Sequence, residues 1–172
     1  MVDGVPEQSG QPALSNGDVA RIFAQIAGLL EFREENAFKV RSYSMAAETI
    51  SGMANSVVEI GQRGGPEELQ KIPGIGKSIS GQIMEIIKTG TSVYFESLKT
   101  EIPVSVLELR RVSGIGLKTA QVLYREFGIK SLDQLRQFAE GGGLKSVRGL
   151  GEKTAARITR SLSRLAGQHP GR

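Results

Sequence analysis

Three copies of one short pattern constrain the fold of this chain more than any other feature of its sequence. Each copy has a hydrophobic residue, one spacer, Gly-hydrophobic-Gly and then the start of an amphipathic stretch. The copies are KIPGIGKSISGQI (71–83), RVSGIGLKTAQVL (111–123) and SVRGLGEKTAARI (146–158). Glycine suits a turn that needs a positive φ or a close approach of the backbone, which a Cβ would obstruct. We therefore predict two helices joined by a tight turn at each copy, with Ile75, Ile115 and Leu150 inserted into the core.

The remaining sequence is helical in pattern. Apolar residues from Val19 to Leu30 follow the i, i+3, i+4 spacing of an amphipathic helix. Asn16 or Asp18 is expected to cap that helix. β-branched residues never alternate over a useful length, so we expect an all-α fold of roughly nine to eleven short helices. The expected divisions are a disordered leader (1–15), a helical domain with the first turn (16–98), a helical domain with the other two turns (99–166) and a tail (167–172).

Positive charge is concentrated toward the C-terminus. The chain has 172 residues, with 22 Lys and Arg against 18 Asp and Glu and a formal net charge of +4. Residues 1–70 carry 5 basic and 10 acidic side chains, whereas residues 109–172 carry 13 basic and 4 acidic ones, a balance of +9. Such asymmetry indicates either a polyanionic partner, with nucleic acid first, or a solvated Lys- and Arg-rich helical surface.

Composition excludes several classes of function. The chain has no Cys and one His, which rules out a disulfide framework, a thiolate metal site and a histidine-based zinc site. No apolar run approaches the ~18 residues of a membrane span, and no signal peptide begins the chain. We therefore expect a cytoplasmic protein, nucleoid-associated if bacterial, without a membrane partner. Gly76-Lys77-Ser78 resembles the end of a P-loop, but position 71 is Lys and no strand precedes it.

The predicted turns are suited to binding phosphate. A helix that begins at each turn presents free backbone N–H groups and the positive end of its dipole, and a Lys follows each turn within two residues. Contacts of this kind hold nucleic acid without reading its sequence. The alternative is that the glycine turns only join packed helices, with Thr119 and Thr154 as ordinary first-turn caps. The predicted DNA-binding residues are Gly74, Gly76, Lys77, Ser78, Gly114, Gly116, Lys118, Thr119, Gly149, Gly151, Lys153 and Thr154.

The three turns match the helix-hairpin-helix motif, and residues 16–165 resemble the N-terminal part of family X DNA polymerases of the bacterial type. The resemblance rests on NAFKVRSY (36–43), KIPGIG (71–76), VSGIG (112–116) and GIKSL (128–132). It implies a lyase-like domain with the first hairpin and a fingers (or thumb) subdomain with the second and third. It also implies double-stranded DNA with a gap or nick as the partner, and repair enzymes as further partners. Acidic residues after position 108 stand singly, so no carboxylate pair of a polymerase palm is present there.

Two functions are alternatives to DNA binding. One is enzymatic, the lyase activity on a deoxyribose phosphate or abasic site, and the other is that of a protein-docking module of a repair complex. In lyase-active members a Lys attacks the abasic sugar, but the matching residue here is Gln82, whose amide cannot form an imine. Lys39 and Lys71 remain possible substitute amines. Lys39 and Tyr43 match positions of the family's lyase pocket, Phe38 stands where some members have His, and Phe38 and Tyr43 are expected in the core rather than as base-stacking platforms.

The resemblance implies no required cofactor, but it implies a monovalent cation, K⁺ or Na⁺, held by carbonyl oxygens of the first two hairpins. The residues in question are Gln70, Ile72, Ile75, Arg110, Val112 and Ile115.

Overall fold

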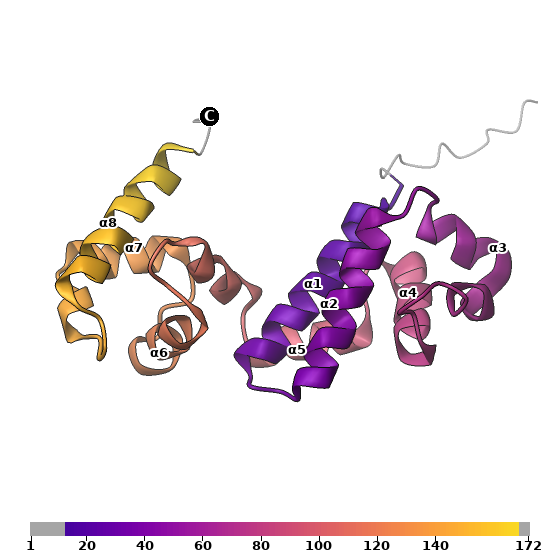
Figure 1. Ribbon diagram of the computed structural model, residues 1–172, viewed down its shortest axis with the longest axis horizontal. Coiled ribbons are helices and arrows are strands. Elements are labelled where there is room, and N and C mark those ends of the chain that lie inside the picture. The colour runs from indigo at the N-terminus through magenta and orange to yellow at the C-terminus, as the bar shows by residue number, and fades with distance from the viewer. Residues whose placement is uncertain (1–12, 169–172) are drawn as a thin grey trace, which may run out of the picture.

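Residues 13–168 are described by the computed structural model of the chain, and every regular element among them is a helix (Figure 1). The all-α expectation is therefore confirmed for these residues. The predicted leader (1–15) and tail (167–172) lie mostly outside the described part. The elements are α1 (Asn16–Phe32), α2 (Ala37–Gly52), α3 (Val57–Leu69), α4 (Lys77–Thr89), α5 (Val93–Glu101), the 3-10 helix η1 (Val104–Arg111), α6 (Leu117–Phe127), α7 (Leu132–Glu140), the 3-10 helix η2 (Gly143–Ser146) and α8 (Glu152–Gly167).

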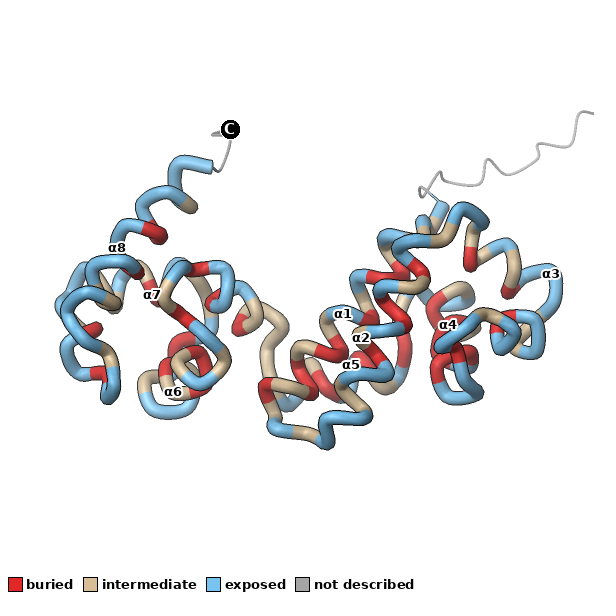
Figure 2. The backbone as a smooth tube through the Cα atoms, in the orientation of Figure 1, coloured by how far each residue is buried: buried red, intermediate tan, exposed pale blue. Residues whose placement is uncertain are grey.

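The helices form two lobes. In the N-terminal lobe α1 packs along α2, α3 packs on α4, and α5 contacts both α1 and α4. In the C-terminal lobe α7 contacts η1, η2 and α8. Figure 2 shows buried residues along the inner sides of these helices and exposed residues around them. The predicted domain boundary between residues 98 and 99 falls within α5 and stays a prediction.

The start of α1 is capped differently from the expectation. Ser15 is the N-cap: its Oγ accepts the N–H of Asp18 (3.1 Å), and the Asp18 carboxylate accepts the N–H of Ser15 (2.9 Å). The Asn16 side chain instead donates to the Asn55 carbonyl oxygen (2.8 Å) and accepts the N–H of Val57 (2.8 Å). Asn16 thus ties the beginning of α1 to the loop before α3, a long-range contact that local spacing does not reveal.

The lobes meet at the end of α1. Phe32 is buried, its ring lies 5.7 Å from the ring of Tyr124 in α6, and its carbonyl oxygen accepts the side-chain N–H of buried Gln121 (2.8 Å). Leu107 of η1 lies against Gly28 so closely that a Cβ there would be 3.1 Å from its methyl carbons. These contacts join α1 of the N-terminal lobe to η1 and α6.

Candidate nucleic-acid interface

The three glycine turns share one backbone geometry. Their first glycines, Gly74, Gly114 and Gly149, have φ of +84°, +100° and +79°. In each turn the central hydrophobic residue donates its N–H to the carbonyl oxygen three residues earlier, at 3.0, 3.0 and 3.3 Å. This bond with a positive φ at the third position is a type II turn, which requires glycine there and favours proline just before it, as at Pro73. The predicted turns are therefore present at all three copies.

The central residues of the turns fill the core unequally. Ile75 and Ile115 are buried, as expected. Leu150 is half-buried and packs against the core, so its insertion at the third turn is less complete. Leu150 also lines a pocket with Leu144 and Ala155.

The helices after the turns begin without side-chain caps. Gly76, Gly116 and Gly151 are the N-caps of α4, α6 and α8, and no side chain bonds to the first-turn amides of these helices. The other five α-helices are all capped by a side chain. Those caps are Ser15, Asn36, Ser56, Ser92 and Ser131. Among the α-helices of residues 13–168, an N-terminus without a side-chain cap therefore occurs only at the hairpins; the 3-10 helices η1 and η2 also lack such a cap.

The space in front of these N-termini is open. A Cβ built on Gly76, Gly116 or Gly151 would meet nothing within 4 Å. Lys77, Lys118 and Lys153 are exposed and make no ion pair with another described residue. Thr119 and Thr154 are half-buried, and neither hydroxyl makes a hydrogen bond within the described chain, so the capping alternative has no support from their contacts. Ser78 is exposed beside Lys77.

The second and third hairpins are adjacent, whereas the first hairpin is in the N-terminal lobe. The second hairpin packs on α8: the N–H of Ser113 donates to the buried Oγ of Ser161 (2.9 Å). A Cβ on Gly114 would lie 3.0 Å from Ile158 Cγ1 and 3.4 Å from both Thr154 Cγ2 and Arg157 Nε. The helix that begins at the third hairpin therefore covers the second turn. Ser161 has no motif signal in the sequence, because its role depends on this packing.

A pocket of about 620 Å³ lies beside the first hairpin, where Lys39, Tyr43 and Gln82 meet as the resemblance implies. Gln82 is buried: its amide donates to the Tyr43 hydroxyl (2.7 Å), and its carbonyl oxygen accepts the Ser92 hydroxyl (3.3 Å). Lys39 Nζ lies 5.1 Å from the Tyr94 ring centroid. Its polar contact with Tyr94, opposed by partial desolvation, raises the pKa of the Lys39 amine.

Tyr43 lies in the core as expected, whereas Phe38 does not. Tyr43 is buried and stacks between Phe23 (6.1 Å) and Tyr94 (5.8 Å). Phe38 is 80% exposed and not in the core. It follows the N-cap Asn36 by two residues, in the first turn of α2, where its side chain is exposed to solvent.

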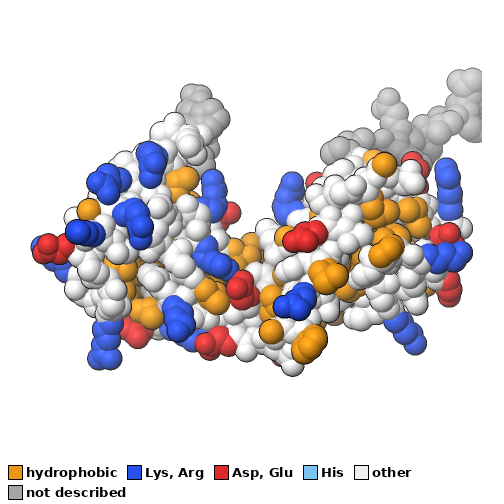
Figure 3. Space-filling view, in the orientation of Figure 1, with side chains coloured by type: hydrophobic (Ala, Val, Ile, Leu, Met, Phe, Trp, Pro, Cys, Tyr) orange, Lys and Arg blue, Asp and Glu red, His pale blue; other side chains and the backbone are white. Residues whose placement is uncertain are grey.

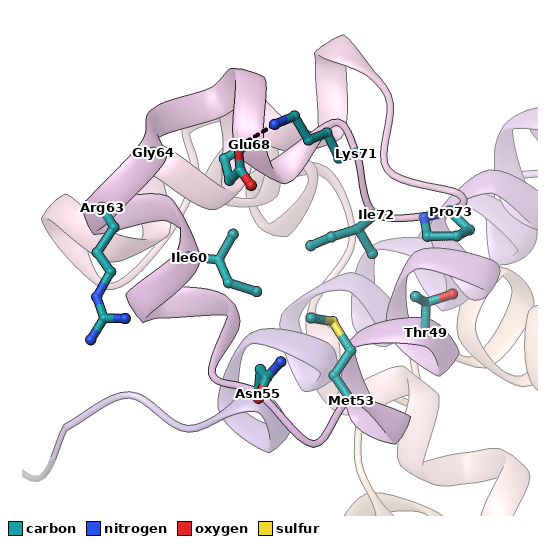
Figure 4. Close-up of a pocket in the computed structure, with 10 residues that line it drawn as sticks. All are labelled: Thr49, Met53, Asn55, Ile60, Arg63, Gly64, Glu68, Lys71, Ile72 and Pro73. Carbon is teal, nitrogen blue, oxygen red and sulfur yellow. Dashed lines mark hydrogen bonds and ion pairs between the residues drawn. The ribbon is translucent and has the colours of Figure 1, made fainter.

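The other candidate amine, Lys71, lies at a different cavity (Figure 4). This cavity of about 800 Å³ has an apolar lining that includes Met53, Ile60 and Ile72. Lys71 Nζ is paired with Glu68 Oε2 at 2.7 Å. The structure therefore does not bring Lys71 together with Lys39 and Gln82.

The carbonyl oxygens implied as cation ligands fit that role in part. Those of Ile72 and Val112 accept the turn hydrogen bonds, whereas those of Ile75 and Ile115 accept none from the described residues. Gln70 ends α3 and Arg110 lies in η1, each two residues before the turn. Residues 13–168 contain no cluster of three or more His, Asp or Glu suited to a metal.

Two family models of helix-hairpin-helix type match the chain. Residues 15–92 match the model of a helix-hairpin-helix domain, and residues 106–164 match that of a SAM-like helix-hairpin-helix tandem. Both matched regions are therefore similar to helix-hairpin-helix domains, and together they include all three hairpins. Along 90% of its length it is 30% identical to the DNA polymerase/3'-5' exonuclease PolX of Bacillus subtilis (strain 168), and the resemblance to the N-terminal helix-hairpin-helix region of X-family polymerases is confirmed.

Other relatives have related names. Rat DNA polymerase lambda is 35% identical over 42% of this chain, and the Holliday junction branch migration complex subunit RuvA of Acidovorax sp. (strain JS42) is 27% identical over 58% of it. The chain spans 26% of the PolX relative, 12% of polymerase lambda and 53% of RuvA. The comparisons support DNA binding as the broad function of such a chain. No helix within residues 13–168 has the length and apolar character needed to cross a membrane.

Proposed function

We propose that this chain binds DNA without sequence specificity, through phosphates held at its three hairpin turns. The observation that carries the proposal is that the three hairpin helices begin at glycine and lack side-chain caps, whereas the other five α-helices have them. Free amides at a helix N-terminus and its positive dipole end favour an anion. An exposed Lys beside each turn adds charge to the same phosphate.

The arrangement of the turns suits an interrupted duplex. The second and third hairpins are adjacent through α8, and the first is in the other lobe, whose helix α1 contacts α6 through Phe32. Two separate contacts on one DNA are easiest to satisfy simultaneously where the DNA bends, and a gap or nick lowers the cost of bending. The preference for gapped or nicked DNA, and repair enzymes as partners, rest on the resemblance to family X polymerases.

We include K⁺ or Na⁺ at the first two hairpins in the proposal. The carbonyl oxygens of Ile75 and Ile115, which lack protein donors among the described residues, would provide hard oxygen ligands there. A cation at this place would supply positive charge close to the phosphate site. No cofactor is required for the binding we propose.

A salt titration tests the proposal. Binding of the full chain to gapped, nicked and intact duplexes is measured by fluorescence anisotropy between about 50 and 200 mM salt. Neutralising about three to six phosphates predicts an affinity loss of roughly 40- to 2,000-fold over this range, with the interrupted duplexes bound most tightly. An affinity that hardly changes with salt would contradict phosphate binding, and equal affinity for all three duplexes would contradict the preference.

We expect no lyase chemistry from the native chain. The raised pKa of Lys39 keeps this amine protonated at neutral pH, and a protonated amine is not a nucleophile. Borohydride treatment with abasic DNA is expected to trap no adduct, whereas Gln82→Lys, which places an amine beside Tyr43, is expected to produce one. An adduct on Lys39 or Lys71 of the native chain would show that the chain is an enzyme.

A further inference from the structure

One face of α8 is a continuous stripe of positive charge. Lys153, Arg157, Arg160 and Arg164 follow one another at intervals of four, three and four residues, and all are exposed. At 3.6 residues per turn they lie within a sector of about 60° around the helix axis. Ile158 and Leu162 lie on the opposite side, buried in the lobe. Figure 3 shows Lys and Arg side chains gathered over the lobe that contains α8. We call these four residues the α8 stripe.

Within the described chain the α8 stripe has no acidic partner, which distinguishes it from four arginines of its lobe but not from Lys118, Lys130, Lys145 and Arg148. Within the described chain, four arginines of this lobe form ion pairs with Glu31, Glu108, Glu34 and Asp133 at 2.8, 2.6, 3.5 and 2.9 Å. These arginines are Arg110, Arg111, Arg125 and Arg136. The members of the α8 stripe make no such pair with any described residue.

Folding does not account for this arrangement. Like charges at i, i+3 and i, i+4 repel one another on a helix, each pair by a few tenths of a kcal/mol. The α8 stripe contains three consecutive pairs of this kind. Neutral polar residues at these positions would stabilise the isolated lobe better, so the charges are suited to an anionic partner.

The position of the α8 stripe relates it to the hairpins. Lys153 is the second residue of α8, directly after the third turn. Arg157 borders the second turn, because its Nε lies 3.4 Å from where a Cβ of Gly114 would be. Arg160 and Arg164 continue along α8 for about 10 Å beyond Arg157. The surface therefore begins at two predicted phosphate sites and extends away from both.

We propose that the α8 stripe is an additional DNA-binding surface, which follows the phosphate backbone of the DNA past the second and third hairpins. This inference rests on the proposed function and adds Arg157, Arg160 and Arg164 to its contacts. The α8 stripe is about 16 Å long, which corresponds to roughly five phosphates of one strand at 3.4 Å per nucleotide along the duplex axis.

The surroundings of the α8 stripe favour DNA over a lipid surface. A helix that lies in a membrane interface needs an exposed apolar face beside its basic one. The large apolar residues of α8 face the lobe instead. The exposed large hydrophobic residues of the described chain are in the N-terminal lobe: Phe38, Met45 and Val93.

The test compares two variants of the full chain that lose the same charge. In the first, Arg157, Arg160 and Arg164 are all changed to Gln; in the control, Arg21, Arg63 and Lys88, exposed in the N-terminal lobe, are changed to Gln. Anisotropy titrations use an intact duplex of about 30 base pairs and its nicked form. The slope of log K against log salt is negative, and each lost phosphate contact makes it less steep by about 0.9. The slope of the first variant should therefore be less steep than that of the native chain by about 2–3. We expect its affinity to fall at least tenfold at about 50 mM salt, with the control close to the native chain.

The outcomes separate this inference from the proposed function. If the native chain shows no steep salt dependence, the proposed function fails. If the native chain binds steeply but the two variants behave alike, the inference is overturned and hairpin binding stands. Binding of the native chain to anionic phosphatidylserine vesicles that is lost in the first variant, with DNA affinity unchanged, also overturns it.

Folding is checked by thermal melting. Relief of repulsion is expected to leave the melting temperature of the first variant unchanged or slightly higher. If that variant fails to fold, Arg164→Glu alone provides the comparison, because Arg164 lies two turns beyond the residue that contacts the second hairpin. We expect a slope reduction of at least about 1 from this change, and no reduction would overturn the inference.

Discussion

Gly114→Val is expected to destabilise the C-terminal lobe by about 3–5 kcal/mol, because strain and overpacking act together. A β-branched residue at a φ of +100° is strained whatever the space around it. The new Cβ would also lie 3.0 Å from Cγ1 of Ile158, a fully buried residue of α8. Urea unfolding of the full chain measures the loss, and DNA affinity is measured on the same preparation.

Two other hairpin glycines serve as matched controls. Gly149 and Gly74 also have positive φ, but a Cβ on Gly149 meets nothing within 4 Å, and one on Gly74 meets only Thr49 Oγ1 at 3.8 Å. Valine at either position should therefore cost only the backbone strain, about 1–3 kcal/mol. We expect Gly114→Val and Gly149→Val to weaken DNA binding more than Gly74→Val, because the C-terminal region carries the excess of positive charge. Equal losses of stability at all three glycines would contradict the packing role of Gly114.

Phe32→Ala is expected to cost about 3–5 kcal/mol in the free energy of unfolding. Phe32 ends α1, is 1% exposed, and packs edge-on against Tyr124 of the other lobe at an interplanar angle of 68°. Removing the ring leaves a cavity exactly where the lobes meet and admits water to the bond between Gln121 and the Phe32 carbonyl oxygen. Urea unfolding monitored by far-UV circular dichroism measures the cost.

A conservative variant separates packing from other effects of the change. Phe32→Leu keeps an apolar side chain at the junction and is expected to cost less than about 2 kcal/mol. If Phe32→Ala costs less than about 1 kcal/mol, the junction does not contribute to stability as the buried contacts indicate.

Local patterns were sufficient to predict the hairpins. A glycine that must adopt positive φ, followed by a helix with apolar residues at helical spacing, specifies its turn through interactions between near neighbours in the chain. Ile75 and Ile115 are buried as that pattern indicates. The expectation of a core position was wrong for Phe38, because hydrophobic character does not say whether a neighbouring element covers the side chain.

Long-range partners explain most of what sequence reasoning missed. Ser161 holds the second turn from 48 residues away, and Gln121 bonds to α1 from 89 residues away. Neither residue belongs to a repeated motif. The four basic residues of the α8 stripe are visible in the sequence at helical spacing, but their lack of acidic partners and the contact of Arg157 with the second hairpin depend on packing.

The sequence alone determined the all-helical class, the three turns and the charge asymmetry, because each depends on residue type and on spacing along the chain. The tertiary structure decided which hairpins lie together, which helix N-termini stay uncapped and which cations lack partners. These properties arise from contacts between residues far apart in the chain, such as Gly114 with Ile158 and Phe32 with Tyr124. Short-range preferences specify a helix and its turn, but burial against a distant partner fixes their arrangement.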